Sequence, residues 1–145
     1  SPDGQRIVFS SWSEVGGTGK ASIYTMPDIY VINPDGSDLT SLNKAGIAPA
    51  WSPDGRQIVF SRVLSFIFSA ELEWGIDVMN VAGDGLTSLT DEGSSPSWSP
   101  DGKQIAFSRT LDGSSSEIWI MDADGTNQRK LTNGSQPAWR PAQRR

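Results

Sequence analysis

The stretch Trp98-Ser-Pro-Asp-Gly-Lys-Gln-Ile-Ala-Phe-Ser108 decides the fold, because it recurs through the chain. Nearly the same letters, Trp-Ser-Pro-Asp-Gly-Arg-Gln-Ile-Val-Phe-Ser, stand at 51–61, and a copy without the tryptophan stands at 1–10. A shortened copy, Trp-Arg-Pro, occupies 139–141. Self-similarity at a roughly fixed period is typical of proteins built from stacked structural units. The stretch therefore predicts a repeat architecture.

A second turn marker recurs at a similar spacing to the first. The Pro-Asp-Gly glycines are 47 to 51 residues apart, and a further set of glycines is 47 and 42 residues apart (Gly36, Gly83 and Gly125). The leucines that follow these glycines keep the same spacing (Leu42, Leu89 and Leu131). Two independent markers in step define a true repeat of about 41 to 51 residues.

Each repeat predicts four short strands, here called a to d. In the third repeat these are 96–99, 103–108, 117–121 and 128–132. Pro-Asp-Gly forms the turn between strands a and b, because Pro presets φ, Asp bonds back to the backbone and Gly accepts a positive φ. The aspartates of these motifs are therefore interpreted as turn residues (Asp3, Asp54 and Asp101).

The other repeats follow the same plan. The first predicts strands b, c and d at 5–10, 28–32 and 39–42, and the second predicts strands a to d at 49–52, 56–61, 76–79 and 86–89. No stretch shows an uninterrupted helical period with caps, so we expect little helix.

Four short strands with apolar residues on both faces match a propeller blade, because blades stack face to face. We therefore expect an all-β fold, a β-propeller with three four-stranded antiparallel blades. The chain forms one half-propeller domain, 1–145. Blade 1 spans 1–43 plus a carboxy-terminal strand at 136–140, blade 2 spans 48–90, and blade 3 spans 95–132.

The third repeat carries a family resemblance. Trp98 to Ser108, followed by Glu117-Ile-Trp-Ile-Met-Asp-Ala-Asp-Gly125 and Arg129-Lys-Leu-Thr132, resembles the TolB-type propeller repeat. It is also similar to blades in the non-catalytic propellers of prolyl-oligopeptidase-like enzymes. The resemblance implies six blades, protein partners and a bacterial periplasmic or extracellular setting. Its matching residues build blades, so it says little about activity.

The strand count predicts how the ring closes. The first repeat lacks strand a, and 137–140 is a strand a with nothing after it. Propellers have about four to eight blades, so three should not close alone. We expect a homodimer of six blades in which each carboxy-terminal strand completes the partner's first blade, through Pro137, Ala138 and Trp139 against Ile7 and Phe9. The alternative is a piece of a longer propeller.

Composition excludes several classes of function. A net charge of −5 argues against a nucleic-acid binder. No apolar run approaches the ~18 residues of a membrane helix, so we expect no membrane insertion. The chain has no His and no Cys, which removes histidine-dependent triads, disulfides and the common zinc sites. We expect no cofactor and no metal.

The connections between strands b and c differ most between repeats, at 11–27, 62–74 and 109–116. The two longer connections combine aromatic with acidic residues, which are typical of an interaction surface (Trp12, Glu14, Tyr24, Phe66, Phe68, Glu71, Glu73 and Trp74). We expect this face, or the central channel, to bind a peptide, a protein or a small anionic ligand. The alternative is that these aromatics pack beneath their own loops.

Two residues depart from the repeat. Asp77 takes the strand c position that Tyr30 and Trp119 fill in the other blades, and a carboxylate between blades needs a partner, for which Arg62 is a candidate. Arg140 replaces the serine of Trp-Ser-Pro. Since strand a lines the channel, two Arg140 side chains of a dimer predict an anion site there. The alternative is an arginine at a frayed terminus.

The sequence therefore predicts a non-catalytic binding and assembly module rather than an enzyme. A first alternative is a carbohydrate-active lyase or glycoside hydrolase that uses carboxylates such as Glu71 and Glu73, although nothing in the sequence sets the carboxylate separation such chemistry needs. A second alternative is a structural assembly unit with no ligand.

Overall fold

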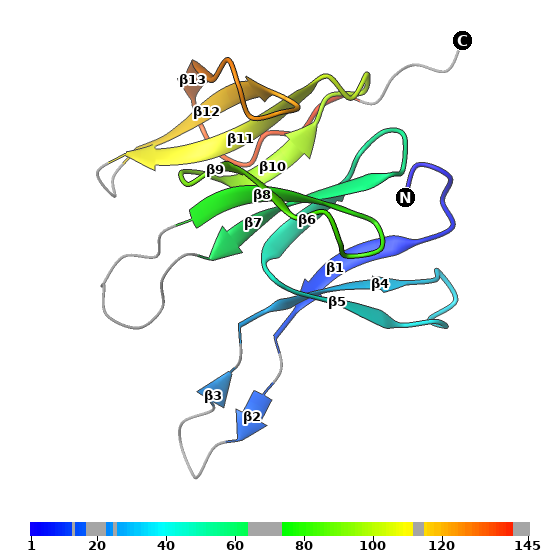
Figure 1. Cartoon of the computed structure of the whole chain (residues 1–145). Coiled ribbons are helices and arrows are strands. Elements are labelled where there is room, and N and C mark those ends of the chain that lie inside the picture. The colour runs from blue at the N-terminus through cyan, green and yellow to red at the C-terminus, as the bar shows by residue number, and fades with distance from the viewer. Residues whose placement is uncertain (13, 17–22, 25, 64–73, 112–114, 141–145) are drawn as a thin grey trace.

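The computed structural model describes residues 1–12, 14–16, 23–24, 26–63, 74–111 and 115–140. These residues form antiparallel β-sheets and contain no helix (Figure 1). No helix in this part of the chain is therefore long and apolar enough to cross a membrane.

Blade 1 is a sheet of three strands within the described residues. These are β1 (Ile7–Ser11), β4 (Asp28–Ile32) and β5 (Thr40–Ala45), paired in that order. They correspond to strands b, c and d, so the blade has no strand a of its own in the described residues. The connection from β1 to β4 contains a short hairpin, β2 (Glu14–Gly16) and β3 (Ile23–Tyr24), which the sequence did not predict.

Blades 2 and 3 each have four strands in chain order, as predicted. Blade 2 consists of β6 (Ile47–Trp51), β7 (Gln57–Val63), β8 (Trp74–Asn80) and β9 (Thr87–Thr90). Blade 3 consists of β10 (Ser94–Trp98), β11 (Gln104–Leu111), β12 (Ser115–Asp122) and β13 (Arg129–Asn133). The prediction of three four-stranded blades therefore holds for two of them, and blade 1 shows three strands.

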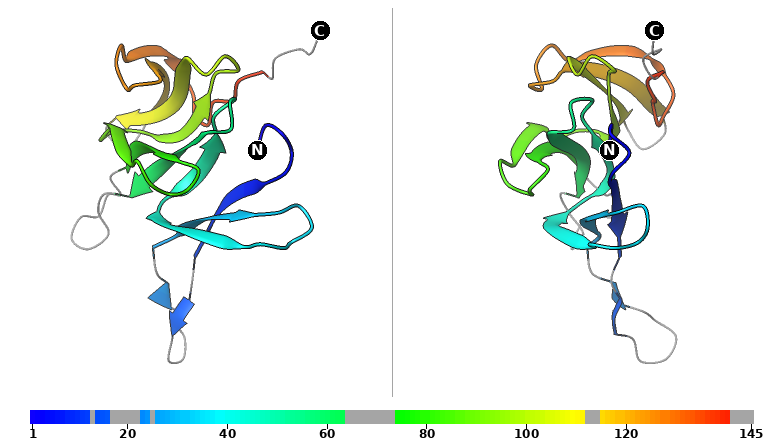
Figure 2. Two further views of the ribbon diagram at one scale, coloured as in Figure 1. Left: turned by 45° about the vertical axis from the view of Figure 1, so that its right-hand side comes forward. Right: turned by 90° about the vertical axis from the view of Figure 1, so that its right-hand side faces the viewer.

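The two central strands of blade 2 are buried on both faces. In β7 the consecutive residues Ile58, Val59 and Phe60 are all buried. Successive side chains of a strand point to opposite faces, so an unbroken buried run requires a neighbour on each side. The neighbours are the adjacent blades, which stack against one another (Figure 2).

Two apolar clusters hold the stack together. The first joins blades 1 and 2 (Ile29, Val31, Leu42, Ile58, Phe60 and Met79). The second joins blades 2 and 3 (Val59, Ile76, Val78, Leu89, Trp98, Ile105, Phe107 and Met121). At full burial each large side chain contributes roughly 1.5–3 kcal/mol.

The a–b turns are stabilised by a serine and an aspartate. Ser52 Oγ donates to Asp54 Oδ1 at 2.6 Å and accepts from the Gln57 backbone N–H at 2.9 Å. The turns at Ser99 and Ser1 make the same two bonds. The Ser52 hydroxyl, together with the Arg56 backbone N–H, lowers the pKa of Asp54 below its ordinary 3.8. The interpretation of these aspartates as turn residues is confirmed.

Residues 134–140 follow the path of a strand a without forming a ladder. The Gly134 N–H donates to the Ser116 carbonyl at 2.9 Å. Gly46 and Gly93 make the equivalent bonds, at 2.8 and 3.0 Å, where the chain enters β6 and β10. The chain therefore leaves blade 3 in the same way as it leaves blades 1 and 2.

Gln136, further along the terminal segment, also matches its counterparts at the starts of β6 and β10. Gln136 has a φ of 54°, close to the 50° of Ala48 and the 53° of Ser95. The Gln136 N–H donates to Ser108 Oγ at 2.8 Å, and the Ser95 N–H donates to Ser61 Oγ at 2.9 Å. Residues 134–140 thus lie where the first strand of a following blade would begin.

Acid should weaken the a–b turns in a predictable direction. A carboxyl whose pKa is lower in the folded state stabilises the fold above its unfolded pKa, and this contribution disappears as the pH falls through the folded value. We expect the Ser52→Ala/Ser99→Ala variant to be less stable than wild type at pH 7, and the difference to narrow below pH 3.8. Urea unfolding at several pH values measures this, and a difference independent of pH would contradict the assignment.

Candidate functional site

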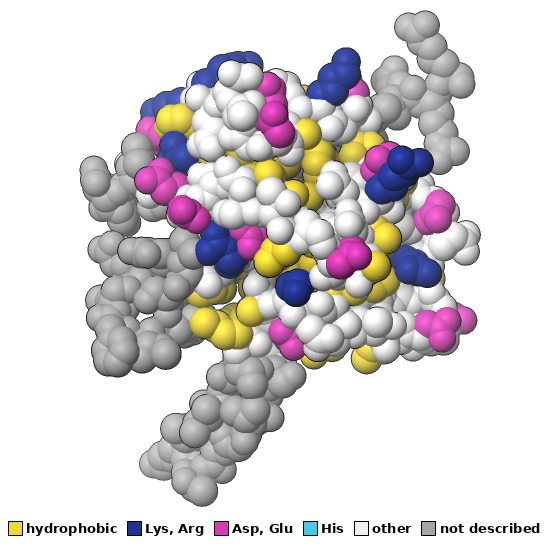
Figure 3. Space-filling model, in the orientation of Figure 1, with side chains coloured by type: hydrophobic (Ala, Val, Ile, Leu, Met, Phe, Trp, Pro, Cys, Tyr) yellow, Lys and Arg dark blue, Asp and Glu magenta, His cyan; other side chains and the backbone are white. Residues whose placement is uncertain are grey.

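The candidate site lies at the end of the molecule where strands b end and strands c begin. Acidic and basic side chains stand next to one another there, along the left of Figure 3. The described part consists of Arg62 on β7, Arg109 on β11, and the linker between blades 2 and 3 that carries Asp91 and Glu92. We call this set the charged rim.

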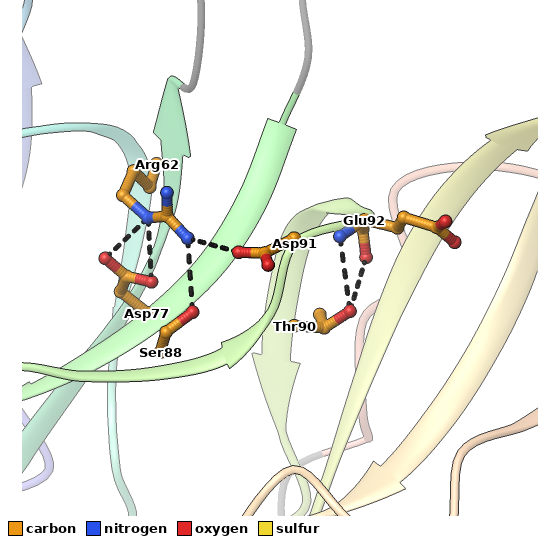
Figure 4. Close-up of polar contacts among 6 residues, drawn as sticks. All are labelled: Arg62, Asp77, Ser88, Thr90, Asp91 and Glu92. Atoms are coloured by element: carbon orange, nitrogen blue, oxygen red, sulfur yellow. Dashed lines mark hydrogen bonds and ion pairs between the residues drawn. The ribbon is translucent and has the colours of Figure 1, made fainter.

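Arg62 pairs with the buried carboxylate of Asp77. Its Nε lies 3.0 Å from Asp77 Oδ1 and 2.9 Å from Oδ2, and Asp77 is only 2% exposed (Figure 4). Asp77 lies opposite Phe60 in the ladder, at the position that Trp119 occupies opposite Phe107. The predicted partnership of Asp77 with Arg62 is confirmed.

The outer nitrogen of Arg62 reaches the surface. Nη2 donates to Ser88 Oγ at 3.1 Å and to Asp91 Oδ1 at 2.8 Å (Figure 4). Burial opposes the charge on the guanidinium, but its hydrogen bonds to Asp77 and Asp91 outweigh that effect and raise the pKa of Arg62. One guanidinium therefore joins strand b, strand c, strand d and the linker.

Arg109 holds the linker from the side of blade 3. Its guanidinium carbon lies 4.2 Å from the centroid of the Trp119 ring, a cation–π contact, and Nη2 donates to Gln128 Oε1 at 2.9 Å. Nε lies 3.2 Å from Glu92 Oε2. Asp91 and Glu92 therefore form ion pairs with arginines of two different blades, although Arg109 Nε makes no hydrogen bond in its pair.

A further acid on blade 3, Glu117, lies opposite Arg109 of the charged rim in the ladder. Glu117 accepts from Trp119 Nε1 at 2.9 Å and pairs with the ammonium of Lys130. The hydrogen bond from Lys130, followed by that from Trp119, lowers the pKa of Glu117. Glu117 therefore stays ionised well below neutral pH.

The same ladder position holds a different contact in each blade. Blade 1 stacks Phe9 on Tyr30 with centroids 5.6 Å apart. Blade 2 pairs Arg62 with Asp77, and blade 3 stacks Arg109 on Trp119. The backbone is repeated, whereas the side-chain chemistry is not.

Chemically, the charged rim suits recognition of another macromolecule. Asp91 and Glu92 are exposed, and their arginine partners hold them in place. Fixed charges at a surface favour charge-complementary partners and speed their encounter. No group of three or more acidic side chains in the described residues is arranged to hold a metal ion.

The predicted loop residues fall into three groups. Trp12 follows β1 and is 48% exposed, and Trp74 begins β8 opposite Val63. Glu14 and Tyr24 lie opposite each other in the β2–β3 hairpin. Phe66, Phe68, Glu71 and Glu73 lie outside the described residues, and with them the proposed carboxylate pair. Their roles stay predictions.

The predicted channel is lined by strands a. β6 and β10 contact each other, and with the terminal segment they border an open groove of about 370 Å³ (Ala48, Pro49, Ala50, Ser95, Pro96, Ser97, Gln136 and Pro137). Arg140 is exposed, and Ser52 and Ser99 at its repeat position are buried in their turns. An anion role for Arg140 stays a prediction.

Sequence reasoning missed Asp91, Glu92, Arg109, Glu117 and Lys130. A signal was present for Arg109, because both Ser61 and Ser108 are followed by arginine at the end of strand b. Nothing local connected Arg109 to Glu92, since Glu92 lies on the linker between blades 2 and 3 and Arg109 lies on a strand of blade 3.

Comparison with solved structures places the fold among propellers. A protein assigned as TolB from Agrobacterium tumefaciens is 24% identical with a TM-score of 0.69, over 96% of this chain and 52% of that one. TolB from Acinetobacter baumannii is 21% identical with a TM-score of 0.66, over 90% of this chain and 31% of that one. The β-propeller domain of the trilobed protease from Pyrococcus furiosus is 16% identical with a TM-score of 0.57, over 92% and 40%.

These likenesses show the fold, which is a partial TolB-like β-propeller. The chain spans about half, or less, of the length of these proteins. No protein-family model matches the sequence, and a comparison with curated proteins finds no match.

Removing Arg62 should expose the cost of the buried Asp77 carboxylate. We expect Arg62→Met to lower the free energy of unfolding by about 3 kcal/mol, because breaking a buried pair leaves an uncompensated charge. Arg62→Met/Asp77→Leu should recover part of this loss. Arg56→Met, at an exposed site, should change stability by less than about 0.5 kcal/mol. Urea unfolding measures all three, and a double variant less stable than Arg62→Met would contradict the prediction.

Proposed function

We propose that the chain is a non-catalytic β-propeller module that binds a peptide or protein partner at the charged rim and its neighbouring b–c connections. Two copies close into a six-bladed ring, which presents two such rims on one face. The observation that carries the binding role is the Asp91-Glu92 linker, whose exposed carboxylates pair with arginines of two blades.

Ring closure is supported by the two ends of the arc that the three blades form, because one end carries the strand that the other end lacks. Residues 134–140 lie where a strand a begins, and β1 has no strand on its inner side in the described residues. In blades 2 and 3, Trp51 lies opposite Ile58 and Trp98 lies opposite Ile105. By the same register, Trp139 of a second copy lies opposite Ile7.

Burial fits this pairing. Ile58 and Ile105 have no exposed surface, whereas Ile7 is 49% exposed. A tryptophan against Ile7 and Phe9 removes this apolar surface from water. Reciprocal exchange of the same segment between two copies is compatible with a two-fold axis.

The binding role rests on charge. The chain has a net charge of −5, and the exposed carboxylates of the rim lie at the same end of the blades as Trp12 and Trp74. A partner with basic and apolar side chains complements such a surface. The aromatic residues supply contact area, and the rim supplies orientation.

Assembly can be tested by sedimentation over a wide range of chain concentrations. We expect a dimer that is weakened about 30-fold or more by Trp139→Ala, since buried tryptophans are frequent hot spots. Trp12→Ala, away from the closure, should leave the dimer unchanged. A wild-type chain that stays monomeric at every concentration would contradict ring closure.

Binding can be tested with peptides selected on the wild-type protein from a random library. We expect the selected peptides to bind Asp91→Asn/Glu92→Gln about ten-fold more weakly, and to lose affinity as salt is raised. Asp35→Asn, an exposed acid in the c–d turn of blade 1, is the matched control. Peptides that bind the Asp91→Asn/Glu92→Gln variant as tightly as the Asp35→Asn control would show that the interaction lies elsewhere.

A further inference from the structure

Each boundary between blades repeats one contact at the outer edge. The leucine of strand d in one blade lies against the c–d turn glycine of the next blade. A Cβ added at Gly83 would lie 3.1 Å from the Leu42 carbonyl oxygen, and one at Gly125 would lie 2.7 Å from that of Leu89. Leu42 and Leu89 are 8% and 9% exposed. The turn can therefore sit on the leucine only because it carries glycine.

A second contact repeats at the a–b turns. A Cβ added at Gly55 would lie 3.6 Å from Pro2 Cδ, and one at Gly102 would lie 3.7 Å from Pro53 Cδ. The proline of one blade thus lies near the turn glycine of the next. Both contacts run in the same direction around the arc, from each blade to its successor.

The two ends of the arc hold the missing halves of these contacts. Leu131, at the repeat position of Leu42 and Leu89, is 48% exposed on the last strand of blade 3. Among the described residues, no heavy atom lies within 4 Å of a Cβ built at Gly36 or Gly4 in blade 1. Pro100 has the repeat position of Pro2 and Pro53. Blade 3 therefore presents Leu131 and Pro100, and blade 1 presents Gly36 and Gly4.

We infer that Leu131 and Pro100 of one chain pack on Gly36 and Gly4 of a second copy. The inference rests on the proposed self-association and adds a surface to it that is separate from the terminal strand. The occupant is a second copy because the contact continues the interface already made twice within the chain, with the same residue types in the same repeat positions. A two-fold axis forms each contact twice.

The φ values support glycine-specific docking at this surface. Gly36 has a φ of 86°, matching the 85° of Gly83 and the 87° of Gly125. The turn of blade 1 thus already has the backbone shape that receives a leucine in the other blades. A side chain at Gly36 would fill the space that Leu131 of the second copy takes.

Two substitutions test the surface by sedimentation, one on each side of it. We expect Leu131→Ser and Gly36→Ala each to raise the dissociation constant of the dimer at least about ten-fold. Leu86→Ser is the matched control, because Leu86 is also 48% exposed but lies in a c–d turn outside this contact. Far-UV circular dichroism at low concentration checks that each chain stays folded.

Mixing the two variants gives the decisive result. A heterodimer of Leu131→Ser with Gly36→Ala contains one interface with both changes and one interface with neither. We expect the mixture to associate more tightly than either variant alone. Dimers that respond to Trp139→Ala but not to these substitutions would overturn this inference and leave the proposed ring closure intact. A wild-type chain that never dimerises would overturn both.

Discussion

The structure depends on one constraint, which is that every blade needs apolar neighbours on both faces. Val59 and Phe60 are adjacent in β7 and both are buried, although they point to opposite sides. Val59 packs into the cluster with blade 3, and Phe60 packs into the cluster with blade 1. Because blade 2 has no solvent-exposed face and its neighbours repeat its plan, the repeat must keep the same strand spacing and the same turns. Variation is then tolerated mainly where strands meet the connections.

The charged rim shows how such variation is organised. Three blades share one backbone position and fill it with Tyr30, Asp77 or Trp119. In blades 2 and 3 an arginine near the end of strand b contacts this residue, because a guanidinium both pairs with carboxylates and stacks on aromatic rings. A buried carboxylate and a partly buried indole thus occupy the same position within one scaffold. Propellers of TolB and of a protease share this fold, so the scaffold does not define the activity.

Sequence alone predicted the parts that are set locally. The strands, the Ser52–Asp54 turn and the repeat period follow from short motifs whose chemistry acts within a few residues. The need of Asp77 for a partner was also predictable, because a buried charge is costly wherever it lies. The β2–β3 hairpin was missed, since its glycine-rich neighbourhood lacks apolar alternation. The link from Arg109 to Glu92 was missed because it joins two blades, and the repeat does not encode it.

The first turn and the last tryptophan have a genetic consequence. Ser1 makes the bonds of Ser52 and Ser99, and its amino group donates to the Arg6 carbonyl as their backbone N–H groups do to Gln57 and Gln104. Trp139 stands one place before that serine in the repeat. A gene that joined residue 139 to a second copy beginning at Ser1 would read Trp-Ser-Pro-Asp-Gly across the junction. In such a tandem chain the proposed ring closure would become intramolecular, with an effective concentration of the second half of about the millimolar range. The two halves could afterwards accumulate different substitutions, which identical copies cannot do.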